Sequence, residues 1–188
     1  MRIGIDLDNT LNDQVAAASK IYEQETGNCI YDFITKYGFD ECLPADTARR
    51  MNSLVNDPAL YRHVTAIDGA QNAVNKLIDN GHIVYIATAG SPFTFSAKGD
   101  WINTNFPRIN RDNIIHINHK GLLNLDVLID DCAQNLIDGK IYSRVIFDAP
   151  WNRDIHDDVY GIHRMTHWNE IHKIIKQIQT EMDRCEFC

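Results

Sequence analysis

Short apolar runs alternate with segments of helical periodicity along most of the chain. The runs are rich in Ile and Val and are bounded by turn residues or acids, which is typical of buried strands. They lie at residues 3–6, 82–88, 113–117, 126–131 and 143–148. Segments with apolar side chains at helical spacing lie at 68–81, 95–106 and 168–182. This alternation predicts an α/β fold, a doubly wound parallel sheet with helices on both faces.

Residues 13–66 do not follow the alternation. They contain no convincing strand, but two helical segments, at 14–27 and 44–57, flank an aromatic loop, "YDFITKYGF". We expect this stretch to form a small helical cap that is inserted after the first strand, over the edge of the sheet. The predicted domains are a core made of residues 1–12 and 67–188 and a cap made of residues 13–66.

The composition is that of a globular domain, with 188 residues of which 44% are apolar and 23% charged. No run approaches the roughly 18 apolar residues of a membrane helix. Asp6 and Asp8 interrupt what would be the apolar part of a signal peptide, so a cytoplasmic location is expected. The formal charge of −8 argues against a polynucleotide partner, which needs a basic surface, but is compatible with a small anionic ligand.

Two pairs of acids follow two of the predicted strands. Asp6 and Asp8 lie in "RIGIDLDNTLND" at the end of the first strand, and Asp130 and Asp131 end the fourth. Ligands of open parallel sheets bind past the carboxyl ends of the strands, where the strand order reverses. If the two strands are neighbours there, four acids converge, and a hard divalent cation such as Mg²⁺ would relieve their repulsion. A single acid after a strand is more often a helix cap, but two doublets favour a metal site.

The same acids belong to a set of motifs that resembles the haloacid dehalogenase (HAD) superfamily. "DLDNT" is similar to its first motif, "YIAT" to its second, and "HK", ten residues before "IDD", to its third and fourth. The flanking stretches "AIDGAQNAVNKL", "NHKGLLNLDVLIDD", "FDAPWNR" and "THWNEI" resemble the 5′(3′)-deoxyribonucleotidase family, including its bacterial and phage members. This resemblance implies a sheet order of 3-2-1-4-5 and a short helical cap.

The resemblance also implies roles for the acids. Asp6 would be the nucleophile and form an aspartyl-phosphate, while Asp8 would protonate the leaving oxygen and later deprotonate the attacking water. Mg²⁺ would be held by the Asp6 carboxylate, the Asp8 backbone carbonyl and Asp130. Asp131 would lie in the direct or the outer coordination shell.

Phosphate contacts follow from the second and third motifs. The Thr88 hydroxyl and backbone N–H groups of the loop that starts at Ala89 would bind phosphate oxygens. Lys120 would supply fixed positive charge, and Lys98 is a second basic candidate. Family members often carry Ser where this chain has Ala89, so Ser91 is the expected substitute donor.

Substrate recognition is less well defined by the sequence. The best-known nucleotidases have Arg where Asn118 stands, two positions before the motif lysine, which leaves substrate preference open. Phe33 and Tyr37, with Tyr31 behind them, are candidates to stack on a base, although they equally fit the interior of the cap. "PWNR" after the fifth strand is expected to bring Asn152 or Arg153 to the rim of the site. Three late histidines are expected on the surface or in loops: His156, His163 and His167.

The function expected from these features is a Mg²⁺-dependent phosphatase that hydrolyses deoxyribonucleoside 5′(3′)-monophosphates. A phosphatase for another small phosphomonoester, such as a sugar phosphate, is the alternative. A receiver-like signalling domain shares the sheet, the acids and a lysine, but it carries them in a different order along the chain. The expected partner is a small nucleotide and not a membrane, and a homodimer is left open.

Overall fold

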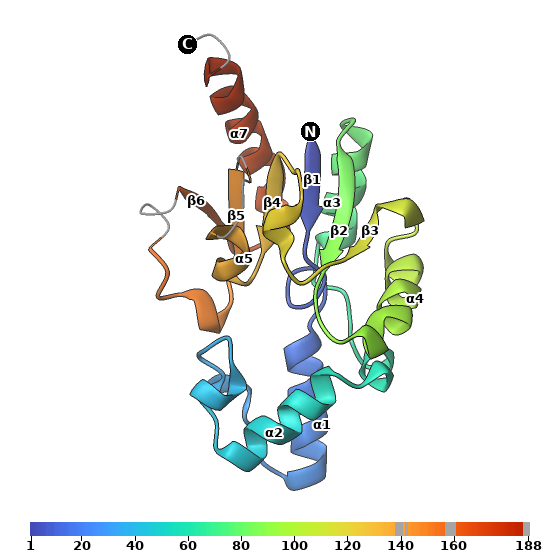
Figure 1. The fold of residues 1–188 in the computed structure, drawn as a ribbon, viewed down its shortest axis with the longest axis vertical. Coiled ribbons are helices and arrows are strands. Elements are labelled where there is room, and N and C mark those ends of the chain that lie inside the picture. The colour runs from blue at the N-terminus through green and yellow to red at the C-terminus, as the bar shows by residue number, and fades with distance from the viewer. Residues whose placement is uncertain (138–140, 142, 157–160, 186–188) are drawn as a thin grey trace.

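The computed structural model describes residues 1–137, 141, 143–156 and 161–185, and here six parallel strands form one sheet (Figure 1). The strands are β1 (Arg2–Ile5), β2 (Ile83–Thr88), β3 (Ile114–His116), β4 (Val127–Asp130), β5 (Ser143–Phe147) and β6 (Ile162–Met165). Their order is β3-β2-β1-β4-β5-β6. The predicted α/β fold class is confirmed, and the observed order contains the predicted order of five strands.

The prediction lacked β6, which pairs with β5 at the edge of the sheet. The two end residues of β6, Ile162 and Met165, are buried, whereas the two between them are half-buried and polar. An edge strand is held largely by backbone hydrogen bonds to one neighbour, so its side chains need not show a strand pattern. One histidine expected on the surface or in a loop, His163, is therefore a half-buried residue of β6.

The two faces of the sheet bury different side chains because successive residues of a strand point to opposite sides. On one face, Ile3 and Ile5 of β1 belong to the main apolar cluster, together with residues of α3 (Ala70–Asp79) and α7 (Ile171–Cys185). These two helices match the helical segments predicted at 68–81 and 168–182. The apolar stripe predicted on the second of them is buried: Ile171, Ile174, Ile175 and Ile178.

The opposite face holds a smaller apolar cluster that includes Leu125, Leu128 and, from α5 (Ala133–Ile137), Leu136. At the centre of this face β1 carries Gly4. A Cβ atom at Gly4 would lie 2.4 Å from a methyl carbon of Leu125, so the absence of a side chain lets Leu125 cross the strand closely. The third predicted helix is α4 (Phe95–Asn105), which follows β2.

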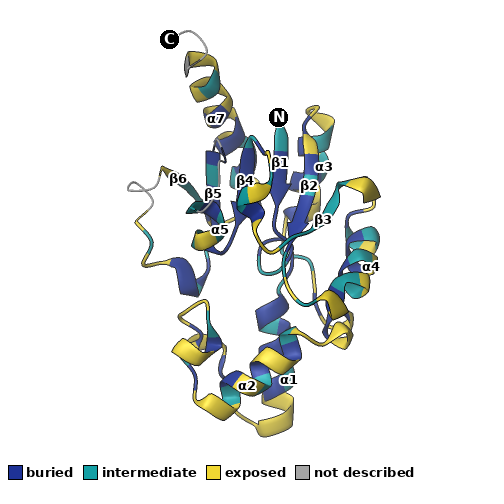
Figure 2. Ribbon diagram, in the orientation of Figure 1, coloured by how far each residue is buried: buried dark blue, intermediate teal, exposed yellow. Residues whose placement is uncertain are grey.

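The segment between β1 and α3 is helical and lies past the carboxyl ends of the strands (Figure 1). It contains α1 (Gln14–Thr26), α2 (Ala45–Val55) and three short 3₁₀ helices, at Tyr31–Phe33, Phe39–Glu41 and Pro58–Arg62. The two α-helices pack against each other through buried residues, and the end of the segment farthest from the sheet is largely exposed (Figure 2).

Hydrogen bonds tie together the two points where this segment leaves and rejoins the rest of the chain. The Asp13 carboxylate accepts from the Thr65 backbone N–H at 2.6 Å and from its hydroxyl at 2.8 Å. The Ile67 N–H donates to the Leu11 carbonyl at 2.9 Å. The helical segment therefore leaves and returns at one place.

Among the described residues, no helix is long and apolar enough to cross a membrane.

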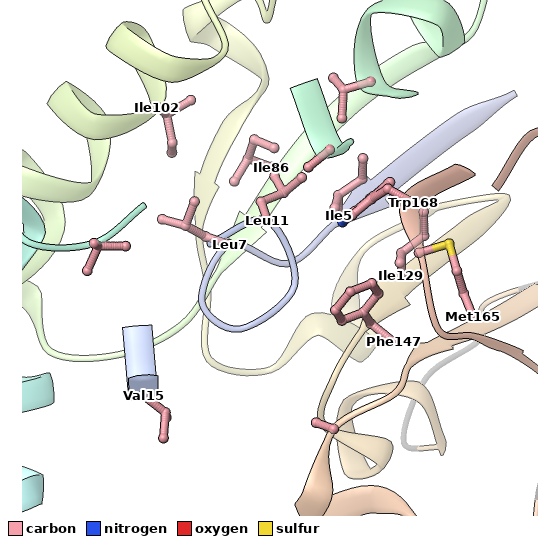
Figure 3. Close-up of a cluster of buried hydrophobic side chains, with 14 of the residues drawn as sticks. Ile5, Leu7, Leu11, Val15, Ile86, Ile102, Ile129, Phe147, Met165 and Trp168 are labelled. Atoms are coloured by element: carbon pink, nitrogen blue, oxygen red, sulfur yellow. The ribbon is translucent and has the colours of Figure 1, made fainter. Parts of the chain in front are cut away.

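Trp168 anchors the loop that follows β1. Its ring stacks near Phe147, with centroids 6.0 Å apart, and lies beside Met165 in the buried cluster of Figure 3. Its indole N–H donates to the Thr10 carbonyl at 2.9 Å. Because Leu7 of the same loop is also fully buried, the acids around it are held on a fixed backbone.

We predict that Trp168→Phe lowers the free energy of unfolding by about 1–3 kcal/mol, because the buried Thr10 carbonyl loses its hydrogen-bond donor. Urea denaturation measures the change. Phe93→Ala, at a side chain that is 84% exposed, is the control and should change the same quantity by less than about 0.5 kcal/mol. A Trp168→Phe protein as stable as the control would contradict the anchoring role.

Candidate active site

The register of the sheet brings Asp6 and Asp130 together. Ile5 of β1 pairs with Ile129 of β4, and the Asp6 N–H donates to the Ile129 carbonyl at 2.8 Å. Asp6 and Asp130, which follow this pair of residues, therefore lie side by side at the carboxyl ends of the two strands. One carboxylate oxygen from each of Asp6, Asp130 and Asp131 lies within 4.8 Å of the others, and all three residues are buried.

The loop after β1 turns sharply at Asn9, whose φ of 61° lies in the left-handed region that Asn tolerates better than most residues. The Asn9 side-chain oxygen accepts from the Val15 N–H at 2.9 Å. The Asn12 side-chain oxygen accepts from the backbone N–H groups of Asn9 and Gln14. These bonds close the turn between β1 and α1 and hold Asp8 at the start of that turn.

Lys120 joins two of the buried acids. Its ammonium lies 2.5 Å from an Asp6 oxygen and 2.6 Å from an Asp130 oxygen, and the side chain is 1% exposed. Burial lowers the pKa of Lys120, but the Asp130 and Asp6 carboxylates outweigh it and raise the pKa above its ordinary value, so the residue is a permanent cation. Burial also raises the pKa of Asp6, to about 7, although Lys120 opposes this.

Neutral donors hold the other two acids of the buried triad. Asp130 accepts from the Cys132 N–H at 2.9 Å and from the Asn135 amide at 3.0 Å. Asp131 accepts from the Trp151 indole N–H at 2.9 Å. Burial raises the pKa of Asp131 well above its usual value. The orientations of both carboxylates are thus fixed before any ligand binds.

Lys98 forms an ion pair with Asp8, as Lys120 does with the buried acids. It projects from α4, is 2% exposed, and places its ammonium 2.7 Å from an Asp8 oxygen. The same ammonium donates to the Thr88 hydroxyl at 3.0 Å and to the Ala89 carbonyl. Lys98 therefore connects the acid that follows β1 with the end of β2, where the second motif ends.

The charges of this cluster do not balance. Four carboxylates, those of Asp6, Asp8, Asp130 and Asp131, contact or surround two ammonium groups, so full ionisation leaves an excess of two negative charges. Carboxylate oxygens are the donors that hard divalent cations prefer. The buried triad of Asp6, Asp130 and Asp131 therefore fits a divalent metal ion in both charge and donor type.

A cavity of about 150 Å³ opens over this cluster. Its lining includes Asp6, Asp8, Asp131, Lys98, Lys120, and the loop residues Ala89 to Ser91. A second cavity, of about 310 Å³, adjoins it and lies against the helical segment. Four residues line both of them: Asn9, Gln14, Tyr37 and Val55. We refer to these two adjoining cavities together as the cleft; the larger of them has fewer charged residues in its lining.

The structure brings one of the aromatic candidates to this cleft. Tyr37 lines both cavities and Phe33 lines neither, although the two residues are similarly exposed, at 62% and 65%. Tyr31 is also exposed and lines neither cavity. The helical segment therefore does not enclose these three rings in one interior, which is the other role that the sequence allows for them.

The loop after β5 contributes a different residue from the two expected. Asn152 is buried and donates to the Asp131 backbone carbonyl at 2.8 Å, so it supports the loop and does not reach the rim. Arg153 pairs with Asp148 on the surface. The side chain that reaches the acids is Trp151, which the sequence did not single out.

Two further residues at the site were missed. Tyr61 donates to an Asp8 oxygen at 2.7 Å, and Asn135 donates to Asp130. The sequence contains a weak indication of Asn135, because an Asn shortly after an acidic doublet, at the start of a helix, is well placed to donate a hydrogen bond back to the strand end. The sequence contains no indication of Tyr61, since Tyr61 lies 53 residues from Asp8.

Solved structures with the same fold include HAD-like hydrolases. A haloacid dehalogenase-like protein of Agrobacterium tumefaciens superposes with a TM-score of 0.65 at 15% identity, over 95% of this chain and 98% of its own. The hydrolase YfnB of Bacillus subtilis, crystallised with magnesium bound, gives 0.56 at 14% identity, over 92% and 97% of the two chains.

The family is defined more narrowly by sequence. Residues 1–181 match the family described as 5′ nucleotidase, deoxy (pyrimidine), cytosolic type C protein (NT5C). A 5′(3′)-deoxyribonucleotidase of Clostridium acetobutylicum is 30% identical over 155 residues, which is 80% of this chain and 83% of the relative. The chain belongs to this deoxyribonucleotidase family and is a phosphoric monoester hydrolase.

The pKa of Asp6 predicts how the metal-free protein responds to pH. The folded protein retains the Asp6 proton up to about pH 7, whereas the unfolded chain releases it near pH 4. Folding therefore binds a proton between these values, and the contribution of Asp6 to the free energy of unfolding falls as the pH rises toward 7. Asn does not titrate, and its amide oxygen still accepts from Lys120.

In EDTA, Asp6→Asn should raise the free energy of unfolding more at pH 8 than at pH 5, with a difference on the order of a few kcal/mol. Urea denaturation of both proteins at both pH values tests this. The double difference cancels the contributions of groups that do not interact with Asp6. The Asp6 charge also raises the pKa of Asp131, so the loss of this charge adds to the gain at pH 8. If the gain is equal at the two pH values, burial does not shift the pKa of Asp6 as described.

Proposed function

We propose that this protein hydrolyses deoxyribonucleoside monophosphates, with Asp6 as nucleophile and a magnesium ion bound at the acidic triad. The observation that carries the proposal is the position of Asp6, which contacts Lys120, lies within 4.8 Å of the other two buried acids and lines the cavity that opens over them. The family description and the names of the relatives support a deoxyribonucleotide substrate, pyrimidine nucleotides in particular.

Magnesium is the proposed metal because the donors are all oxygens and the cluster has two negative charges in excess. The Asp6 carboxylate, the Asp8 backbone carbonyl and Asp130 would hold it, with Asp131 beside them. When bound, the ion draws negative charge away from the phosphate oxygens, which lets an anionic nucleophile approach an anionic substrate. The magnesium in the YfnB crystals supports this choice.

Asp6 would attack the phosphorus atom and form an aspartyl-phosphate, and the sugar oxygen would leave on the opposite side. The backbone of β1 and its bond to Ile129 fix the direction of the attack. Lys120 would stabilise the negative charge that develops on the phosphoryl oxygens. The Thr88 hydroxyl and the backbone N–H groups from Ala89 onward would hold the remaining oxygens.

Asp8 would act on the other side of the phosphorus. In the first half of the reaction its carboxyl proton would pass to the leaving sugar oxygen, which gives the free deoxyribonucleoside. In the second half its carboxylate would take a proton from the water that attacks the aspartyl-phosphate. Asp8 returns to the carboxylic acid, Asp6 is released, and inorganic phosphate leaves.

Residues 13–66 would serve as the cap over this site, with the core made of residues 1–12 and 67–188. The paired hydrogen bonds between Asp13 and Thr65 lie where the two parts would meet. Tyr37, which lines both cavities, is the cap residue placed to contact a base, while the exposed Phe33 would contact one only after a movement of its loop. A cytoplasmic location, which the word cytosolic in the family description supports, and a homodimer stay predictions.

The substrate prediction is tested by the release of inorganic phosphate from a panel of nucleoside and deoxynucleoside monophosphates and sugar phosphates. With Mg²⁺ we expect dUMP and dTMP to be among the best substrates and EDTA to abolish turnover. Asp6→Asn should lower kcat by at least about 10³-fold while the circular dichroism spectrum is unchanged. Equal rates on sugar phosphates would favour the broader phosphatase, and inertness toward every ester would refute the proposal.

The covalent step has its own test. After acid quenching of a reaction with labelled substrate, the label should lie on the peptide that contains Asp6 and should be lost on treatment with hydroxylamine, which cleaves acyl phosphates. Asp6→Asn is the control and should carry no label. Full activity with no label at any quench time would show that water attacks the substrate directly.

A further inference from the structure

Asp8 is held by donors from three different parts of the chain. One oxygen pairs with Lys98 at 2.7 Å. The other accepts from the Tyr61 hydroxyl at 2.7 Å and from the Asn12 amide at 3.1 Å. The Tyr61 contact on one oxygen and the Lys98 contact on the other are both 2.7 Å long, so these two donors together fix the rotation of the carboxylate plane.

Tyr61 belongs to the 3₁₀ helix Pro58–Arg62, in the last part of the helical segment before the chain returns to the core. It is buried, with 7% of the residue exposed. The burial and the adjacent Asp8 carboxylate raise the pKa of its hydroxyl, so Tyr61 keeps its proton and acts as a donor toward Asp8. The segment that covers the site therefore contacts Asp8 directly.

A second bond sets the direction in which the Tyr61 hydroxyl donates. The Gln14 amide nitrogen lies 3.3 Å from the Val55 carbonyl, which can only accept, so this end of the amide is the NH₂ group. The same nitrogen lies 3.0 Å from the Tyr61 oxygen and donates to it. With one lone pair of the hydroxyl engaged by Gln14, its single proton is left for Asp8. Gln14 thus donates both to Val55 and to Tyr61, and Tyr61 in turn donates to Asp8.

We propose that Tyr61 is a positioning residue for Asp8, and that through it the helical segment controls how well the acid is aimed at the leaving oxygen. This inference rests on the proposed function, in which Asp8 protonates that oxygen. A misaimed acid slows only a reaction in which the leaving group needs the proton. A deoxyribonucleoside leaves as a strongly basic alkoxide and needs it, whereas p-nitrophenolate or acetate leaves readily without it.

The experiment compares kcat/KM of Tyr61→Phe and wild-type protein, with Mg²⁺, on dUMP and on p-nitrophenyl phosphate and acetyl phosphate. The ratio kcat/KM is used because it reports the steps up to the first irreversible one, which is phosphoryl transfer to Asp6, and excludes the later hydrolysis in which Asp8 acts as a base. We expect a loss of about 10- to 100-fold for dUMP and less than about 3-fold for the activated esters.

Tyr22→Phe is the matched control. Tyr22 lies in α1 of the same segment, is buried to a similar extent, and its hydroxyl bonds to Thr47 at 3.0 Å, away from the acids. Tyr22→Phe removes the same hydroxyl oxygen as Tyr61→Phe. It should leave the ratio of kcat/KM for dUMP to kcat/KM for the activated esters unchanged. Asp8→Asn calibrates the assay, since it should show the same selectivity as Tyr61→Phe to a larger degree.

The outcomes separate the inference from the function on which it rests. A wild-type protein that cleaves dUMP supports the function whatever the variant does. If Tyr61→Phe then lowers kcat/KM equally on all three substrates, or shows the pattern of Tyr22→Phe, Tyr61 has only a structural role and the inference is wrong. A wild-type protein that cleaves none of the three overturns both.

Discussion

Electrostatic repulsion among the buried carboxylates of Asp6, Asp130 and Asp131 is the constraint on which the rest of the structure depends. Burial strengthens this repulsion, because little water is left to screen it. The protein offsets part of it with Lys120 and with neutral donors such as Trp151, and leaves an excess of negative charge that a divalent ion can neutralise. A site balanced completely by lysines would be more stable without metal, but it would have no charge left with which to bind one.

The features that depend on local sequence were predictable. Strand and helix periodicity, together with the family resemblance, gave the sheet, the order of five strands and the helical segment after β1. The parallel arrangement then brings Asp6 close to Asp130 even though 124 positions separate them, because both residues lie at the carboxyl ends of neighbouring strands. The same argument predicts that Thr88 lies near Asp6, because Thr88 ends β2 and β2 is the other neighbour of β1.

The features that the sequence did not predict depend on tertiary contacts. β6 is held by backbone bonds to a single neighbour, and its side chains carry no strand pattern. Tyr61 and Trp151 reach the acids from segments whose position is set by packing, so no spacing along the chain indicates them. The exposure of Phe33 has the same origin: an aromatic residue of a short 3₁₀ helix can point to a cleft or to solvent, and composition does not distinguish the two cases.

The central position of β1 in the sheet has a consequence for synthesis of the chain. Its two neighbours begin at Ile83 and Val127, so β1 emerges from the ribosome long before either of them. Pairing between segments so distant raises the contact order and slows folding, and in that interval both edges of β1 can associate with other nascent chains. Asp6 and Asp8 follow this apolar stretch directly. Charges that flank an apolar strand repel a second copy of it and oppose aggregation, so the position of these two acids also suits the growing chain.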